Sequence, residues 1–167
     1  LMPASKAAMV LSIMAVIAAV FNIINASFCK MCHNHRVIFL KNAAVITFVS
    51  LLIICLCLIF EIRTYFIAVI FFILAANASL TSLLVPVLHL TNRKMVSGTA
   101  VSIMNFCFFT MVGLLGTAMG FLLNLFEPEK SGNVLVYSNQ SYLAVFGLFF
   151  LLSVFELYKA RKLSNKY

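Results

Sequence analysis

Charged residues are scarce in this sequence. They occupy 10% of the 167 positions, whereas hydrophobic residues occupy 64%. Soluble domains carry about 25% charged residues, so a soluble globular protein is excluded and a polytopic membrane protein is predicted. Tryptophan is absent, so any aromatic belt at the membrane surfaces has to come from tyrosine and phenylalanine.

Acidic residues are the rarest charged class. The chain has four, against twelve Lys and Arg, and all four lie near the ends of apolar runs. Serine-hydrolase, zinc-protease and phosphate-binding motifs are also absent. We therefore expect no enzymatic activity and no cofactor. One of the four, Glu156, lies one helical turn before Lys159, and this spacing predicts an ion pair at the membrane interface.

Five apolar runs are each long enough to cross a membrane, which takes about 20 helical residues for about 30 Å of hydrocarbon. We predict one all-α membrane domain over residues 1–167, ending in a tail at 159–167. Only residues 61–63 separate the second span from the third, which favours a helical hairpin. Pro86 lacks the N–H that would bond the Ser82 carbonyl, so we expect the third span to bend there. The predicted spans are residues 7–28, 37–60, 64–90, 95–126 and 141–158.

Lys and Arg are divided unequally between the two sides of these spans. The poorer side has Lys6, Arg63 and Lys130. Because cytoplasmic loops are enriched in basic residues, the richer side and the C-terminus are predicted to be cytoplasmic. This placement at helix ends indicates that the +8 net charge reflects membrane topology and not nucleic-acid binding. The richer side has Lys30, Arg36, Lys41, Arg93, Lys94, Lys159, Arg161, Lys162 and Lys166.

Small and polar residues form one stripe along the fourth span, spaced three or four residues apart. Two of them, Gly116 and Gly120, make a GxxxG pair, which lets two membrane helices approach closely. We expect this stripe to pack against other helices. Its members are Gly98, Ser102, Asn105, Phe109, Gly113, Gly116 and Gly120, of which only Phe109 is large.

Polar side chains occur at membrane depth in the first, third and fourth spans. Asn22, Asn77, Thr81 and Asn105 are the main examples, and Asn25 shares a face with Asn22. Each costs free energy unless it has a partner or faces a water-filled cavity. Two interpretations stay open, hydrogen bonding between helices and lining of a solute path. We expect these three spans to share an interior and the uniformly apolar second span to face lipid.

The segment Cys29–His33 matches the CxxCH pattern of covalent haem attachment, with His35 nearby. A haem or a Cys/His metal site would each use these residues. The predicted orientation places the segment in the cytoplasm, where we do not expect haem attachment. Four metal ligands within seven residues are also hard to arrange around one ion. We therefore predict a short basic loop and no metal.

The order of these features resembles the C-terminal half of a major facilitator superfamily transporter, from its eighth to its twelfth helix. A basic loop is followed by a helical hairpin, a Pro-bent helix and a basic turn at Arg93 and Lys94. The run Ser97-Gly98-Thr99-Ala100 then opens a glycine-rich helix. In the first loop, Lys30, His35 and Arg36 keep the character of the family's cytoplasmic motif, whereas Asn25 and Cys29 replace its Gly and Asp.

This resemblance implies a secondary transporter of small metabolites in the bacterial inner membrane, built from two six-helix halves around a central cavity. The chain would lack the N-terminal half and one helix, and would not transport alone. Asn22, Asn77, Thr81 and Asn105 become the candidates for solute contact. The implied partners are the lipid bilayer, a small solute and the missing half. A self-contained five-span scaffold or regulatory protein is the alternative, and a membrane-embedded enzyme or haem protein is the third hypothesis.

Overall fold

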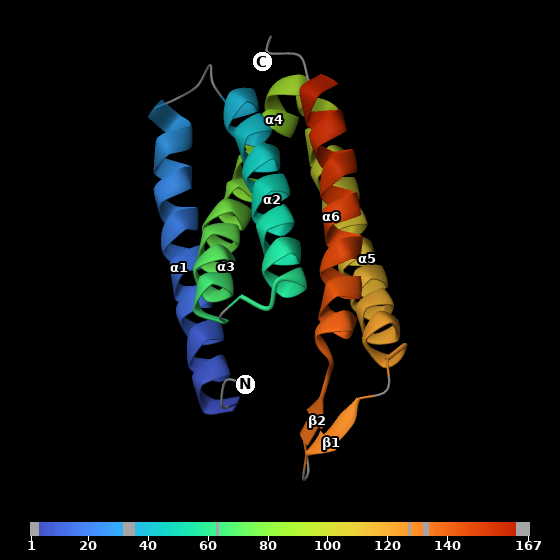
Figure 1. Cartoon of the computed structure of the whole chain (residues 1–167). Coiled ribbons are helices and arrows are strands. Elements are labelled where there is room, and N and C mark those ends of the chain that lie inside the picture. Colours follow the sequence, from blue (N-terminus) through green and yellow to red (C-terminus); the bar gives the residue numbers. More distant parts are fainter. Residues whose placement is uncertain (1–3, 32–35, 63, 127, 132–133, 163–167) are drawn as a thin grey trace.

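The computed structural model describes residues 4–31, 36–62, 64–126, 128–131 and 134–162 (Figure 1). These residues form a bundle of helices with a small β-hairpin at one end. The 3₁₀ segment η1 joins α3 to α4. The helical elements are α1 (Ala4–Met31), α2 (Arg36–Ile59), α3 (Thr64–Ala78), η1 (Ser79–Leu83), α4 (Leu84–Thr91), α5 (Lys94–Asn124) and α6 (Asn139–Lys162).

Four helices, α1, α2, α5 and α6, are long and apolar enough to cross a membrane, and this part of the prediction is confirmed. The predicted third span is not one continuous helix. It is divided into α3, η1 and α4, and the 3₁₀ segment ends three residues before Pro86. The break lies where the missing proline N–H leaves the preceding turn without a normal α-helical bond.

A tight turn at Glu61 reverses the chain after α2. The Ile62 N–H donates to the Cys57 carbonyl at 2.9 Å, which is the six-to-one bond of a Schellman motif. Glu61 occupies the left-handed position of that motif, with φ of 51°, where glycine is usually found. The turn brings α3 back beside α2, as the predicted helical hairpin requires (Figure 1).

The helix α2 is central, so the prediction that the second span faces lipid is wrong. It packs against α6 and α3, and Ile54 and Cys57 form a buried core with Ile70 of α3. The rings of Phe48 and Phe150 lie 5.3 Å apart across the α2–α6 contact. A uniformly apolar helix gives no indication of which side meets protein, because lipid tails are as apolar as leucine.

The helix α5 lies at the edge of the bundle and contacts α4 and α6. Its stripe of small residues faces away from the rest of the described chain. A Cβ atom added to Gly98, Gly113, Gly116 or Gly120 would meet nothing within 4 Å, and Ser97 is the residue of α5 that is buried. Within the described chain the stripe therefore has no helix packed on it.

A β-hairpin connects α5 to α6, which the all-α prediction did not include. Strands β1 (Glu129–Ser131) and β2 (Val134–Val136) pair antiparallel, with Lys130 opposite Leu135. Ser138 then caps α6, since its side-chain oxygen accepts the Ser141 N–H at 3.3 Å. The predicted tail also changes, because α6 continues to Lys162.

The two ends of the bundle differ in charge. The start of α2, the α4–α5 junction and the end of α6 lie together at one end, and the hairpin and the Glu61 turn lie at the other (Figure 1). Arg93, Lys94, Lys159 and Lys162 thus gather at the first end, as the sequence predicts. That this end faces the cytoplasm stays a prediction.

Candidate functional site

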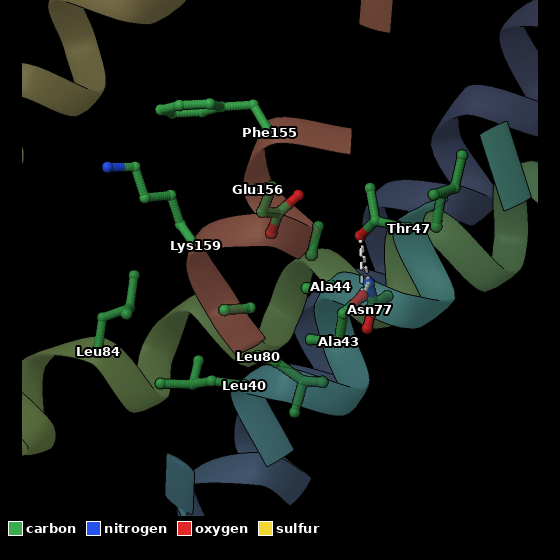
Figure 2. A pocket seen from close by; sticks show the side chains of 13 residues that line it. Leu40, Ala43, Ala44, Thr47, Asn77, Leu80, Leu84, Phe155, Glu156 and Lys159 are labelled. Atoms are coloured by element: carbon green, nitrogen blue, oxygen red, sulfur yellow. Dashed lines mark hydrogen bonds between the residues drawn. The ribbon is translucent and has the colours of Figure 1, made fainter. Parts of the chain in front are cut away.

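A cavity of about 820 Å³ lies between α2, the α3–η1–α4 segment and α6, near the basic end of the bundle (Figure 2). Its size lies within the range of small-molecule sites. Alanines on α2, α3 and α6 leave the space that larger side chains would fill. The described lining is Leu40, Ala43, Ala44, Thr47, Leu74, Asn77, Ala78, Leu80, Leu84, Phe155, Glu156, Lys159 and Ala160.

Asn77 is the polar group at the buried wall of this cavity. Its amide nitrogen donates to the Ala43 carbonyl at 2.9 Å and to the Thr47 hydroxyl at 2.8 Å. The Thr47 hydroxyl donates its own hydrogen to the Ala43 carbonyl at 3.0 Å. Both partners can therefore only accept from Asn77, so its nitrogen, not its oxygen, has to face α2.

The amide oxygen of Asn77 is buried and has no hydrogen-bond donor among the described residues. The whole residue is 9% exposed. An unpaired buried acceptor costs about 1–3 kcal/mol, and native proteins keep few of them. This oxygen exposes less than 1 Å², so it is enclosed by protein atoms and is not an accessible acceptor of the cavity.

Glu156 and Lys159 line the α6 side of the cavity. The Lys159 amine lies 5.2 Å from the centre of the Phe155 ring, a cation–π distance. The ion pair predicted between Glu156 and Lys159 is not formed in the described part of the chain. Figure 2 shows the Lys159 amine turned away from Asn77, while the Glu156 carboxylate lies nearer the α2 wall.

A smaller hollow of about 280 Å³ lies on the other side of Asn77, between α1, α2 and α3. Phe21 and Asn25 line it from α1. The Asn25 amide donates to the Ser79 hydroxyl at 2.6 Å, which ties α1 to η1. Asn25 therefore serves helix packing, and Asn77 lies on the wall between two hollows.

The structure brings only one of the four predicted solute-contact residues to the large cavity. Asn77 lines it, whereas Asn22 and Asn105 have exposed side chains on α1 and α5. Thr81 belongs to η1, but its side chain lies outside the described set. The four residues therefore do not form one cluster among the side chains that the structure describes.

The predicted loop residues are placed only in part. Arg93 and Lys94 are exposed at the α4–α5 junction. His35 and most of the CxxCH segment, and the side chains of Lys30 and Arg36, lie outside the described residues. Elsewhere in the described chain, no three His, Cys, Asp or Glu side chains gather closely enough to hold a metal ion.

Sequence reasoning missed Thr47 and Glu156 as cavity residues. Thr47 was overlooked because the second span was assigned to lipid, although a single threonine in an apolar run indicates a helix contact. Glu156 was assigned to the membrane interface. Only the packing of α6 on α2 places both side chains on one cavity.

Comparison of the chain with protein-family models, with curated proteins and with solved structures finds no match. The membrane-length helices are shared by many membrane proteins with different functions. The cavity and its polar groups therefore supply the evidence on function.

Proposed function

We propose that this chain is part of a secondary active transporter of the major facilitator type, which moves a small solute across the bacterial inner membrane by alternating access. The observation that carries the proposal is the large cavity between apolar helices, which the polar side chains of Asn77 and Glu156 line. Inside a membrane, polar groups without protein partners commonly mark solute or ion paths.

The broken helix beside the cavity also supports a transporter. The segment α3–η1–α4 interrupts its α-helical bonding at Ser79–Leu83, and Leu80 and Leu84 from the break line the cavity. Discontinuous helices are common at transporter binding sites, because the irregular backbone is tolerated where it borders a cavity.

The exposed side of α5 agrees with a chain that works together with further helices. Phe106 and Phe109 are 72% and 69% exposed, and the glycine stripe has no neighbour in the described chain. In the proposed transporter, the rest of the protein packs on this helix.

Two-sided cysteine labelling tests the proposal in membranes from cells that express the gene product from its own locus. Ala43→Cys places a thiol on the cavity wall and keeps the backbone carbonyl that Asn77 bonds. Cys29, Cys32, Cys55 and Cys107 are replaced by alanine, and the buried native Cys57 serves as the internal control. A charged methanethiosulfonate is applied to right-side-out and to inside-out vesicles.

Alternating access predicts that residue 43 is modified from both faces, because the cavity opens to each side in turn. Cys57 should stay unmodified from both faces, since it lies in the core. Modification of residue 43 from one face only, or from neither, would contradict the transporter proposal. The cavity would then be a space between helices that does not open to both sides of the membrane.

A self-contained membrane scaffold or regulatory protein is the second candidate, and the free side of α5 favours it. In that case the glycine stripe would be the docking surface for another membrane protein. Crosslinking from α5 distinguishes the two, because a scaffold would be captured with a different gene product and would fail the two-sided labelling.

A further inference from the structure

We propose that the large cavity binds a small amphipathic zwitterion, such as an amino acid with a large apolar side chain. The ammonium group of this solute binds Glu156, its carboxylate binds Lys159, and its apolar part contacts the leucines of the cavity. As the class of transported solute, this inference rests on the transporter function proposed above. As a statement about binding, it depends only on the cavity.

The α6 wall presents both signs of charge to one cavity. Glu156 and Lys159 both line it, one helical turn apart. Opposite charges at this spacing usually pair with each other on a helix. Here the Lys159 amine lies over the Phe155 ring instead, 5.2 Å from its centre. Each of the two charged groups can therefore take its partner from a bound molecule.

The two charged groups require different partners. A carboxylate only accepts hydrogen bonds and an ammonium group only donates them, so Glu156 calls for a cation with N–H groups and Lys159 for an anion. Both side chains are exposed to the cavity side, and the Glu156 carboxylate lies nearer the α2 wall than the Lys159 amine does (Figure 2). Exposed cation–π contacts are weak and the lysine stem is flexible, so Lys159 can exchange Phe155 for a carboxylate.

A ligand with one charge fits this wall less well than a zwitterion. A lone ammonium group gains the Glu156 carboxylate but lies close to a second cation, Lys159. A lone carboxylate meets the reverse arrangement. A molecule that carries both groups forms two charge-assisted hydrogen bonds and leaves neither side chain next to an unbalanced like charge.

The remaining lining selects an apolar body. Leu40, Leu74, Leu80 and Leu84 line the cavity, together with several alanines. Small-molecule sites typically combine such an apolar wall with a few fixed polar groups. An amino acid with an aromatic or branched side chain matches both parts of this description.

Three probes that share one aromatic body test the inference: phenylalanine, phenethylammonium, which lacks the carboxylate, and 3-phenylpropionate, which lacks the ammonium group. Binding to the full chain in phosphatidylcholine nanodiscs is measured by titration calorimetry, with empty nanodiscs subtracted. Phenylalanine should bind most tightly. Each of the other two should bind about tenfold more weakly, or about 1.4 kcal/mol.

Two variants assign each charge of the ligand to its residue. Glu156→Gln should weaken phenylalanine and phenethylammonium and leave phenylpropionate unchanged. Lys159→Gln should weaken phenylalanine and phenylpropionate and leave phenethylammonium unchanged. The probe that each variant still binds shows that the variant is folded. Glu61→Gln and Lys94→Gln remove matched charges outside the cavity and should change nothing.

A third variant tests whether binding takes place in the cavity at all. Ala43→Leu adds volume to the α2 wall without changing either charge, and it should weaken all three probes. Unchanged binding in this variant would place the probes elsewhere and overturn the inference.

A phosphatidylethanolamine headgroup carries the same pair of charges as the proposed solute, so the titration is repeated in nanodiscs of this lipid. Phenylalanine should bind there with an affinity within about twofold of the value in phosphatidylcholine, because a solute enters from water. Loss of phenylalanine binding in phosphatidylethanolamine would identify the lipid as the occupant and overturn the inference for a solute.

Binding of either singly charged probe as tightly as phenylalanine would also overturn the inference, as would equal weakening of all three probes by Glu156→Gln or Lys159→Gln. The labelling test fails separately. Two-sided labelling without phenylalanine binding would overturn the zwitterion and retain a transporter of another solute. Phenylalanine binding with one-sided labelling would retain the binding site without transport.

Discussion

At the scale of single residues, Asn77 is where stability and proposed function conflict. Its nitrogen ties α3 to α2, while its oxygen is buried without a partner in the described chain. A sequence optimised for stability alone would not keep this oxygen, since an apolar residue would fill the same position at lower cost. Departures from the usual stability rules, such as a buried polar atom without a hydrogen-bond partner, occur most often at functional sites.

Asn77→Leu should therefore leave the free energy of unfolding nearly unchanged or raise it by up to about 1.8 kcal/mol. The variant loses two interhelical hydrogen bonds, worth about 0.6 kcal/mol each in membrane proteins, and removes an unpaired oxygen that costs about 1–3 kcal/mol. Reversible unfolding in mixed micelles measures the change. A loss of more than about 1 kcal/mol would show that the oxygen is satisfied.

Thr47→Val is the matched control at the same contact. It removes the hydroxyl that accepts from Asn77 and donates to Ala43, and it keeps the Asn77 bond to the Ala43 carbonyl. Because Thr47→Val leaves the unpaired Asn77 oxygen in place, nothing offsets the lost hydrogen bonds. The variant should be less stable than wild type by about 0.5–1 kcal/mol in the same unfolding measurement. A stabilised Thr47→Val would mean that this hydroxyl is itself poorly placed.

At the scale of elements, the turn after α2 gives a stability prediction. Glu61 adopts a left-handed conformation, which costs an L-residue about 1–2 kcal/mol and costs glycine almost nothing. Glu61→Gly should raise the free energy of unfolding by about 1 kcal/mol, and Glu61→Ala, which keeps the Cβ atom, should not. A destabilised Glu61→Gly would indicate that the Glu61 side chain makes a stabilising contact.

The break before Pro86 gives a second prediction at this scale. Pro86→Ala restores an N–H, so the Ser82 carbonyl can accept an α-helical bond and the 3₁₀ segment can convert to α-helix. Five residues then turn by about 100° less in total, because a 3₁₀ helix advances 120° per residue and an α-helix about 100°. Leu84 should rotate away from the cavity.

Labelling of Leu84→Cys measures that rotation. In the native background this thiol lies on the cavity wall and should react with a small methanethiosulfonate at a rate similar to Ala43→Cys. In the Pro86→Ala background its rate should fall several-fold, while that of Ala43→Cys should not. Unchanged reactivity at residue 84 would show that the 3₁₀ segment persists without the proline.

A substitution in the stripe of small residues on α5 distinguishes packing within this chain from packing against helices of another protein. Gly116→Leu should leave the free energy of unfolding of the isolated chain unchanged or raise it by up to about 1 kcal/mol, because a Cβ at this position meets no atom within 4 Å and leucine has a higher helix propensity than glycine. The same substitution should reduce crosslinking of α5 to partner helices in native membranes, since GxxxG surfaces depend on close approach. A clear loss of stability in the isolated chain would place the stripe inside the bundle.

At the scale of the whole molecule, the two ends differ in charge and should lie on opposite sides of the membrane. We expect Tyr137→Cys, next to the hairpin, to be labelled by an impermeant maleimide in intact cells. Lys162→Cys, at the end of α6, should be labelled only after permeabilisation, as the positive-inside rule predicts. The reverse pattern would invert the predicted topology.

Several features of the molecule follow from the sequence alone. The four membrane-length helices and the charge difference between the two ends were predicted from local patterns. An irregularity near Pro86 was also predicted, but as a bend in one helix and not as a 3₁₀ break. The reason is physical: a membrane leaves no water to bond the backbone, so a long apolar run has to become a helix, and its ends have to carry the charges.

The tertiary structure alone decided which helix is central and where the cavity lies. The helix α2 and not α5 occupies the middle, and Thr47, Asn77 and Glu156 line one cavity from three different helices. Hydropathy does not contain this information, because an apolar face packs equally well against lipid and against protein. Only the shapes of the packed helices distinguish the two, and these shapes leave the cavity that Asn77 and Glu156 line.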